Sequence, residues 1–294
     1  MITRRGILKG LLGMILAGLF TSAYAFFVEP ALRLRVKRWI IKPHGWAAGP
    51  LKIAVIGDLH VGGPWVTLDR LERVVARTNA LGADLTVFLG DLEAGHRFVQ
   101  EVILPEDAAP VLARLRAPLG VYAILGNNDW WHDRDAQSRG AGPTRVQLAL
   151  EQASIPVLEN RAIRIGEGAQ AFWLAGLGDQ LALARDGGWK GVDDLQGTLE
   201  QVNGKAPIIL LAHEPDIFPQ VPKRVSLTLS GHTHGGQVRL MGWSPVVPSR
   251  FGNRNAYGHV QEDGRDLIVT GGIGCSILPV RFGVVPEITL VELQ

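Results

Sequence analysis

Short polar motifs follow five apolar segments of the sequence, and their side chains are of the types that bind metal ions. The candidate ligands are Asp58, His60, Asp91, Asn127, His213, His232 and His234. Carboxylate, amide and imidazole ligands without a thiolate suit hard or borderline divalent ions such as Mn²⁺, Fe²⁺ or Zn²⁺. Seven ligands of this kind are enough for two divalent ions.

The apolar segments that precede the motifs have the lengths and compositions of strands. The first half of the chain predicts strands over 52–56, 85–89 and 121–125, with helices over 67–81 and 109–116 between them. The second half predicts short strands, with fewer helices, over 172–177, 208–211, 227–229, 267–269 and 288–291. This order indicates an α/β fold in which two sheets pack face to face and helices flank them. Because open α/β sheets bind ligands at the carboxyl ends of their strands, we expect the motifs to meet there.

The charge of the sequence is distributed unevenly. The chain has 294 residues, 30 Lys and Arg against 28 Asp and Glu, and a net charge of +2. Eight of the basic residues, but only Glu29 among the acidic ones, lie in the first fifty positions, so the rest of the chain has a net charge of −5. A mildly acidic body argues against nucleic acid as a partner. The single cysteine, Cys275, excludes an intramolecular disulfide.

The first 28 residues have the pattern of an export signal or a membrane anchor. Residues 10–28 carry no charge, and as a helix they would span about 28 Å, which matches a bilayer core. Residues 3–9 resemble a twin-arginine export signal, and residues 23–25 resemble a cleavage site. Three outcomes stay open: cleaved export, an uncleaved anchor with the body outside, and an anchor with the body in the cytoplasm. We expect association with the inner membrane, or export through the twin-arginine route.

A basic segment over 29–50 connects this leader to the main domain, which is predicted over 51–294. Between positions 32 and 37, Leu and Val alternate with Arg and Lys, which is the period of a half-buried edge strand. The same charges could lie on anionic lipid headgroups, each contributing about 1 kcal/mol near such a surface. Basic residues are more numerous after the apolar stretch than before it, which favours a cytoplasmic body, whereas the twin arginines favour export.

The ordered motifs resemble those of the calcineurin-like metallophosphoesterase superfamily. Its signature is DxH, GD, GNH(D/E), a lone His and GHxH, and the match extends from Leu51 to about Leu240. The closing segment over 271–293 resembles the bacterial branch whose members are membrane-linked or exported. The resemblance implies a four-layer α/β sandwich and metal-dependent hydrolysis of a phosphodiester or pyrophosphate bond in a lipid-linked or envelope substrate. UDP-2,3-diacylglucosamine is the best single candidate, and a cell-wall phosphodiester is the alternative.

Carried over residue by residue, the resemblance implies two metal ions that share one carboxylate. One ion would be held by Asp58, His60, Asp91 and His234, and the other by Asp91, Asn127, His213 and His232. A bridging carboxylate holds two cations about 3.5 to 4 Å apart, a spacing that suits the attacking and leaving oxygens of a phosphoryl transfer. A hydroxide between the ions would then be the nucleophile.

Asn128 stands where the family has a histidine that is taken as a general acid. Such proton transfer contributes about 10² to 10⁴-fold to the rate, and asparagine cannot titrate. Loss of the acid favours a pyrophosphate or another activated diester, because its leaving group departs without a proton. The alternative is a non-catalytic, metal-binding envelope protein. Asp129 is expected to cap or orient its loop, and Glu93 stands one residue before the position of a family acidic residue.

Three further residues are candidates for substrate contacts. Trp130 and Trp131 directly follow the third motif and would pack against a uracil ring or an acyl chain, or else belong to the core. Arg281 would contact a phosphate or form a structural salt bridge. The remaining histidines, which we expect at the surface or behind the ligands, are His44, His96, His132 and His259.

Overall fold

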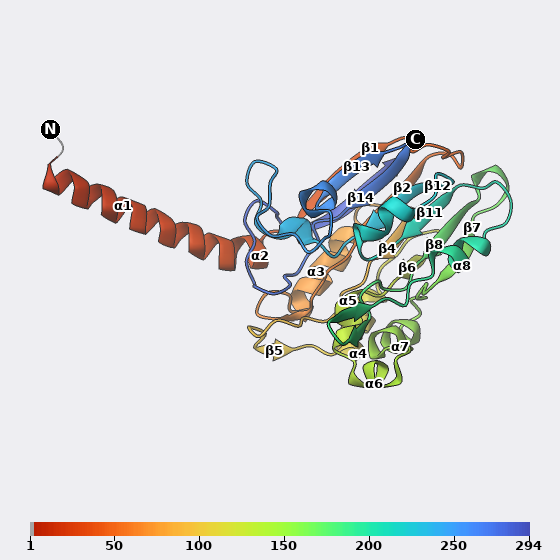
Figure 1. Ribbon diagram of the computed structural model, residues 1–294, viewed down its shortest axis with the longest axis horizontal. Helices are drawn as coiled ribbons and strands as arrows, with labels where there is room; N and C mark the ends of the chain where they lie inside the picture. Colours follow the sequence, from red (N-terminus) through yellow and green to blue (C-terminus); the bar gives the residue numbers. More distant parts are fainter. Residues whose placement is uncertain (1–2) are drawn as a thin grey trace.

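Two mixed β-sheets pack face to face in the computed structural model, which describes residues 3–294 (Figure 1). The strand orders are β1-β15-β2-β4-β6 and β13-β14-β12-β11-β8-β7. The strands of the first sheet are β1 (Arg35–Ile41), β2 (Leu51–Ile56), β4 (Leu85–Phe88), β6 (Val121–Ala123) and β15 (Glu287–Leu293). The strands of the second sheet are β7 (Arg161–Ile165), β8 (Phe172–Gly176), β11 (Ile208–Leu211), β12 (Val225–Ser230), β13 (Gly258–Glu262) and β14 (Arg265–Val269).

Apolar side chains from both sheets fill the space between them. Ile53 and Val87 of the first sheet, and Leu174, Leu229 and Ile268 of the second, are almost fully buried. Helices cover the two outer faces. The helices on the first sheet are α3 (Leu68–Asn79), α4 (Pro105–Leu112) and α7 (Arg145–Gln152), and those on the second are α8 (Leu195–Glu200) and the 3-10 turn Pro215–Gln220. The four-layer α/β sandwich expected from the sequence is confirmed.

The helix that precedes β6 is displaced from its predicted position, and four larger elements were not predicted: β7, β13, α7 and α8. The helix before β6 was expected over 109–116, but α4 begins at Pro105 and ends at Leu112. The earlier start has a local cause, because proline suits the first turn of a helix and the carboxylates of Glu106 and Asp107 favour its positive end. The remaining short elements, none of them predicted, are β3 (Gly62–Gly63), β5 (Glu101–Val102), α5 (Asn127–Trp131), α6 (Arg134–Arg139), β9 (Leu183–Arg185) and β10 (Gly188–Lys190).

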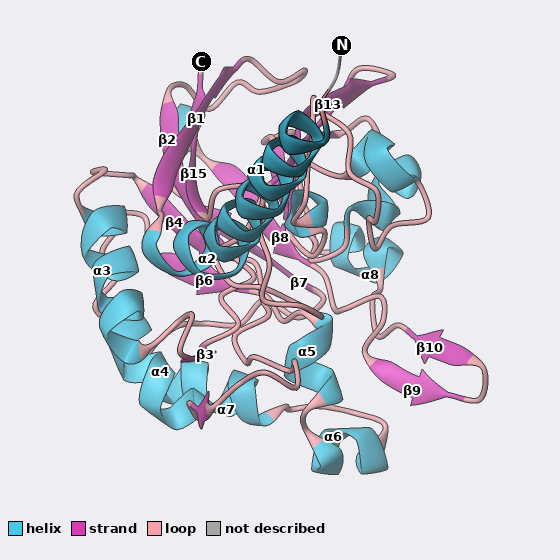
Figure 2. Ribbon diagram, turned by 90° about the vertical axis from the view of Figure 1, so that its left-hand side faces the viewer, coloured by secondary structure: helices cyan, strands magenta, loops and turns pink. Residues whose placement is uncertain are grey.

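The leader forms one helical rod that projects from the body (Figures 1 and 2). α1 (Arg4–Ala23) continues through a π-helical turn (Tyr24–Val28) into α2 (Glu29–Leu32). By length and composition this rod could cross a membrane, and only 6% of its most apolar window is buried in the protein. It is therefore not a core helix of the body.

β1 is the edge strand of the first sheet, and it starts at Arg35 rather than in the predicted alternation at 32. Arg35 and Arg38 form ion pairs with Glu287 (2.8 Å) and Glu292 (3.3 Å) of the neighbouring strand. The strand leads away from the helical rod at about 3.3 Å per residue, so Lys42 lies roughly 20 Å from its start. Of the basic residues in this segment, only those nearest the rod could therefore lie on lipid headgroups.

Candidate metal centre

The seven predicted ligands converge at the carboxyl ends of strands from both sheets. Asp58 and His60 follow β2, Asp91 follows β4, Asn127 follows β6, His213 follows β11, and His232 and His234 follow β12. All of them except His232 are buried. Five of the seven predicted ligands have positive φ angles, between 43° and 65°: Asp58, His60, Asp91, His232 and His234. A non-glycine residue in this region costs about 1 to 3 kcal/mol, and such strain is concentrated at functional sites.

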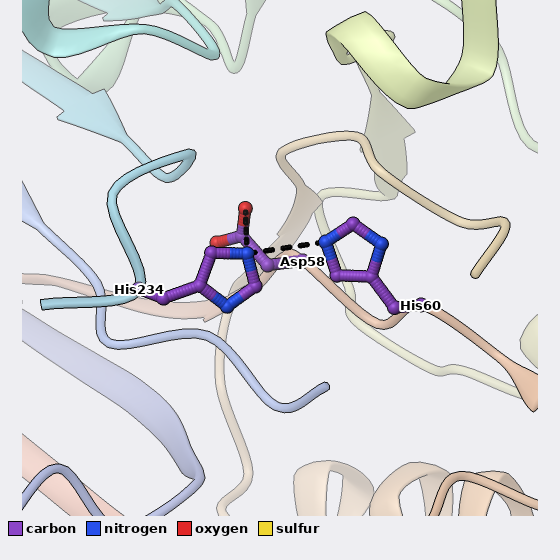
Figure 3. Close-up of side chains that lie close together, drawn as sticks. All are labelled: Asp58, His60 and His234. Carbon is purple, nitrogen blue, oxygen red and sulfur yellow. Dashed lines mark hydrogen bonds and ion pairs between the residues drawn. The ribbon is translucent and has the colours of Figure 1, made fainter. Parts of the chain in front are cut away.

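Asp58, His60 and His234 form the first group of ligands (Figure 3). Nε2 of His60 lies 3.1 Å from Nε2 of His234, which lies 3.7 Å from Oδ1 of Asp58. One ligand atom from each of the three residues lies within 4.8 Å of the others, which is close enough for them to bind one ion. The Oδ2 atom of Asp91 is 3.4 Å from Nε2 of His60.

Asp91 also contacts the second group of ligands. Its Oδ2 atom is 3.4 Å from Nε2 of His213, the same distance that separates it from His60. Beside His213, Nδ1 of His232 lies 2.8 Å from Oδ1 of Asn127. Asp91 therefore lies between the two groups, which is the position that a bridging carboxylate must have.

The donor set fits divalent metal ions. Among the described residues, Oδ2 of Asp58 and Nε2 of His213 are buried polar atoms without a hydrogen-bond partner. Nδ1 of His213 donates to the backbone oxygen of Leu89 (2.6 Å), and Nδ1 of His60 donates to that of Glu93 (2.9 Å). In each neutral ring Nε2 then keeps its lone pair and directs it into the centre, as in metal-binding histidines. Glu93 supports the site through its backbone.

The charges of the centre are set by its burial. Burial raises the pKa of Asp58 to about 7 and lowers the pKa of His60 to about 4. Burial also disfavours the charged forms of Asp91 and His213, but their mutual attraction overcomes this effect. The pKa of Asp91 therefore falls well below its usual range, and that of His213 rises well above its own. Bound cations would stabilise the carboxylates and displace the proton of His213.

Asn128 and Asp129 hold Asp91 in place. The backbone N and Nδ2 of Asn128 donate to Oδ1 and Oδ2 of Asp91, each at 2.8 Å. Asp129 accepts hydrogen bonds from the backbone N–H groups of Asp91 and Gly126 (2.9 Å each) and Leu92 (2.8 Å). Burial and the charge of Asp91 raise the pKa of Asp129 to about 7, whereas the three donors stabilise its charged form. Both residues therefore position the central carboxylate.

A match to a known protein family identifies the kind of site that these residues form. The model of the family described as "Calcineurin-like phosphoesterase" matches residues 51–236, which include every ligand motif. The chain belongs to the calcineurin-like phosphoesterase family. Members of this family use divalent metal ions, and the protein is a metal-dependent phosphoester hydrolase. When bound, such ions would supply an activated water molecule and neutralise charge on the phosphoryl group.

Relatives of this phosphoesterase align along most of its length. The metallophosphoesterase YkuE of Bacillus subtilis is 31% identical over 99% of the chain and 98% of its own length. The phosphodiesterase YaeI of Escherichia coli is 31% identical over 84% of the chain and 83% of its own length. A protein of Danio rerio named "Transmembrane protein with metallophosphoesterase domain" is 29% identical over 83% of the chain, which spans 53% of that protein.

The two tryptophans of this phosphoesterase have different surroundings. Trp130 is fully buried in the core between α4, α7 and the first sheet, so it cannot contact a substrate, and its core alternative holds. Trp131 is partly exposed and stacks on Trp189 of the β9–β10 hairpin, with ring centroids 4.0 Å apart and planes inclined by 18°. Only Trp131 is therefore placed for a substrate contact.

Arg281 is fully buried, and all five of its N–H donors are used within the protein. They are directed at the backbone oxygens of Gly271, Gly274 and Val284 and at Nδ1 of His234. The prediction that Arg281 contacts a phosphate is wrong, because no donor remains, and its neighbours are carbonyls rather than a carboxylate. Its bond to Nδ1 places the proton of a neutral His234 on Nε2, so binding of an ion through Nε2 would require the other tautomer of this ring.

Sequence reasoning missed Glu214 as a polar neighbour of the centre, and it placed His132 only at the surface or behind the ligands. Ligand atoms of Glu214, His213 and His232 lie within 4.8 Å of one another, and Oε1 of Glu214 is buried without a partner in the described chain. His132 adjoins Asn128, because atoms of both lie within 3.0 Å of the position that a Cβ on Gly95 would take. The sequence offered one signal for each residue. Glu214 directly follows His213, and His132 comes four residues after Asn128, a spacing that brings two residues to one face of a helix.

A groove of about 530 Å³ opens beside His232. The residues that line it include the stacked pair Trp131 and Trp189, and also Pro248 and Arg250. The side chain of Arg250 is 70% exposed and contacts Asp216 only through Nε, at 3.4 Å. No local pattern predicted Trp189 or Arg250, because Trp189 lies on β10 and Arg250 on a loop far from it in the sequence.

Proposed function

We propose that the protein hydrolyses a phosphodiester or pyrophosphate bond in a lipid-linked or envelope substrate. The observation that carries this proposal is the position of Asp91, whose Oδ2 atom lies 3.4 Å from Nε2 of both His60 and His213. One ion would be held by Asp58, His60, Asp91 and His234, and the other by Asp91, Asn127, His213 and His232. Two ions held in this way would supply the activated water of the reaction.

The surroundings of Asn128 support an activated leaving group. Its amide donates to Asp91 and carries no titratable proton, so position 128 can orient the bridging carboxylate but cannot protonate a leaving oxygen. A phosphate released from a pyrophosphate has a second pKa of about 6 and departs without such help. A pyrophosphate or another activated diester is therefore a better substrate for this site than an alkyl phosphate.

The groove beside the centre supports a substrate with both a charged and an apolar or planar part. The Trp131–Trp189 pair provides an aromatic wall, and the exposed guanidinium of Arg250 can pair with a phosphate. UDP-2,3-diacylglucosamine combines a planar base, a pyrophosphate and acyl chains, so it is the first substrate to test. A cell-wall phosphodiester is the second, and it requires an exported body.

We also propose that residues 1–28 are a retained anchor, followed by the segment 29–50 and a hydrolase domain over 51–294. Ala25 is buried, and its backbone oxygen accepts a hydrogen bond from N of Arg281 (2.9 Å). The oxygen of Phe26 accepts one from Nε1 of Trp65 (2.9 Å). A peptidase needs an accessible, extended segment, whereas here the predicted cleavage site is helical and packed on the body.

Hydrolysis of bis(p-nitrophenyl) phosphate with Mn²⁺ tests the activity. We expect turnover by the full-length protein and none by Asp91→Asn, because the amide removes the shared negative charge. Asp84→Asn is the matched control, since that carboxylate accepts a hydrogen bond from the N–H of Lys52 at the opposite end of β4. If the protein binds Mn²⁺ but hydrolyses neither this diester nor a nucleotide-linked lipid, it is the non-catalytic metal-binding protein instead.

A further inference from the structure

Exposed apolar side chains gather on two loops of the second half of the chain. Met241 is fully exposed, Ile277 is 78% exposed and Val246 is 69% exposed. We call the whole set the apolar collar: Leu240, Met241, Trp243, Val246, Ile277 and Leu278. Soluble monomers seldom expose large apolar patches, and such patches bind a partner or a membrane.

Backbone contacts join the collar loops to the foot of α1. N of Arg239 donates to the oxygen of Phe282 (2.8 Å), which links the first collar loop to the second. N of Arg281 donates to the oxygen of Ala25 (2.9 Å), and the ring of Phe282 packs edge-on against Tyr24 with centroids 6.2 Å apart. Figure 1 shows these loops, in blue, beside α2 at the base of the projecting helix.

The metal centre opens on the same side of the molecule. β1 begins directly after the helical rod, and its first residue, Arg35, lies opposite Glu287 at the start of β15. β2 runs antiparallel to β15, so the end of β2 that leads to Asp58 lies at this edge too. The first collar loop follows His234 after five residues. Figure 2 looks onto this face, with α1 directed toward the viewer.

The composition of the collar loops matches a lipid surface. No acidic residue occurs over 217–261 or 267–286, the stretches that contain the collar. Trp243 is of a type enriched at membrane–water interfaces. A bilayer that contains α1 also reaches its foot, to which the collar is bonded. This continuity with the anchor favours lipid over a second copy of the chain as the occupant of the collar.

We infer that the apolar collar inserts into the bilayer that α1 crosses, so that the metal centre takes its substrate from the surface of that bilayer. The inference rests on the proposed function and deepens it. The substrate is an amphipathic phosphoester whose acyl chains stay in the membrane while its phosphate reaches the ions. Pro248 and Arg250 of the groove follow the collar residue Val246 in the same loop, so a headgroup in the groove has its apolar part beside the collar.

A fluorescent label tests the insertion without requiring activity. Met241→Cys in a full-length Cys275→Ser background carries an environment-sensitive dye in vesicles of phosphatidylcholine and phosphatidylglycerol, with or without bromine on the acyl chains. We expect bromolipid to remove most of its emission, as it does for a dye at Leu16→Cys in α1. A dye at Leu148→Cys, an exposed apolar position on α7, keeps its emission. Unchanged emission at position 241 overturns the inference. A second copy of the chain that covers the collar in place of lipid would also leave the emission unchanged, and it overturns the inference in the same way.

Kinetics test the route of the substrate. We compare full-length Met241→Glu/Trp243→Glu with Leu148→Glu, which changes an exposed apolar side chain away from the collar. The collar variant keeps its kcat/KM on soluble bis(p-nitrophenyl) phosphate but loses activity on a nucleotide-linked lipid in vesicles. Equal loss on both substrates, or loss on neither, overturns the inference. Inactivity of the unmodified protein on every substrate contradicts the proposed function instead, and the label experiment still decides on insertion.

Discussion

Replacing Asp129 by asparagine tests how the bridging carboxylate is held. Asp129 is fully buried, its Oδ2 atom accepts hydrogen bonds from the N–H groups of Asp91 and Gly126, and its Oδ1 atom accepts one from Leu92. An asparagine keeps the first two bonds if its oxygen takes the place of Oδ2. Its NH₂ group then faces the N–H of Leu92, so one charged bond is lost and one buried donor has no acceptor.

The structure sets the size of the effect. A hydrogen bond to a charged group contributes about 1.5 to 3 kcal/mol, and a buried donor left without an acceptor costs about 1 to 3 kcal/mol. The two terms describe the same lost contact, so we expect Asp129→Asn to lower the free energy of unfolding by about 2 to 3 kcal/mol. Because the loop of Asp91 loosens, we expect Mn²⁺ affinity to fall by about 10 to 100-fold, as is typical for partners behind metal ligands.

Thermal unfolding of the metal-free protein and calorimetric titration with Mn²⁺ measure the two quantities. Asp133→Asn is the matched control: the two oxygens of Asp133 also accept backbone N–H bonds, from Ala136 and Arg145, but the residue is a partly exposed helix N-cap, where water replaces the bond that asparagine loses. The reasoning is refuted if Asp129→Asn behaves like this control. That outcome would mean that Asp129 is protonated at neutral pH, where asparagine is nearly isosteric with it.

Three further changes give distinct results. Asn128→His should raise turnover of an alkyl diester by about 10²-fold or more and turnover of a pyrophosphate far less, because only the alkoxide leaving group needs a proton. An equal gain on both substrates in steady-state kinetics contradicts the proposal of an activated substrate. Mn²⁺ affinity should fall as the pH drops below 7, because Asp58 has a pKa of about 7 and is protonated on the acid side. The fall should be about tenfold per pH unit for each proton displaced. Titrations that give the same affinity from pH 6 to 8 rule this out. Trp131→Ala should raise KM for a large amphipathic substrate but leave kcat/KM for bis(p-nitrophenyl) phosphate unchanged, and equal effects on both would remove the residue from the groove's binding role.

The clustering of the proposed ligands was predictable because each of them lies within a few residues of a strand end. An apolar segment followed by glycine and a polar motif specifies both the element and the exit of the chain, as at Gly57-Asp58 after β2 and Gly90-Asp91 after β4. The parallel strands of an α/β sheet bring those exits to one edge. The four layers follow from the same pattern, since the strands alternate with amphipathic helices.

Residues outside the motifs were predicted less well, because their roles depend on contacts far along the chain. Arg281 comes three residues after the exposed Leu278, yet it is fully buried among carbonyls of the loop over 271–284 and behind His234. Trp130 and Trp131 are neighbours with the same side chain, and the turn of α5 directs one into the core and the other toward Trp189. Nothing in the local sequence distinguishes them.

The amino-acid sequence by itself determined the family, the four layers, the metal-binding residue types and an apolar leader, because each depends on local pattern and strand order. Only the tertiary structure decided which carboxylate lies between the imidazoles, that Asn128 binds Asp91, and that the foot of α1 and the apolar collar lie on the face of the metal centre. The last of these features arises where β1, β2 and β15 pair, which joins segments more than two hundred residues apart. Their positions depend on the packing of the whole chain, and no short stretch of sequence encodes them.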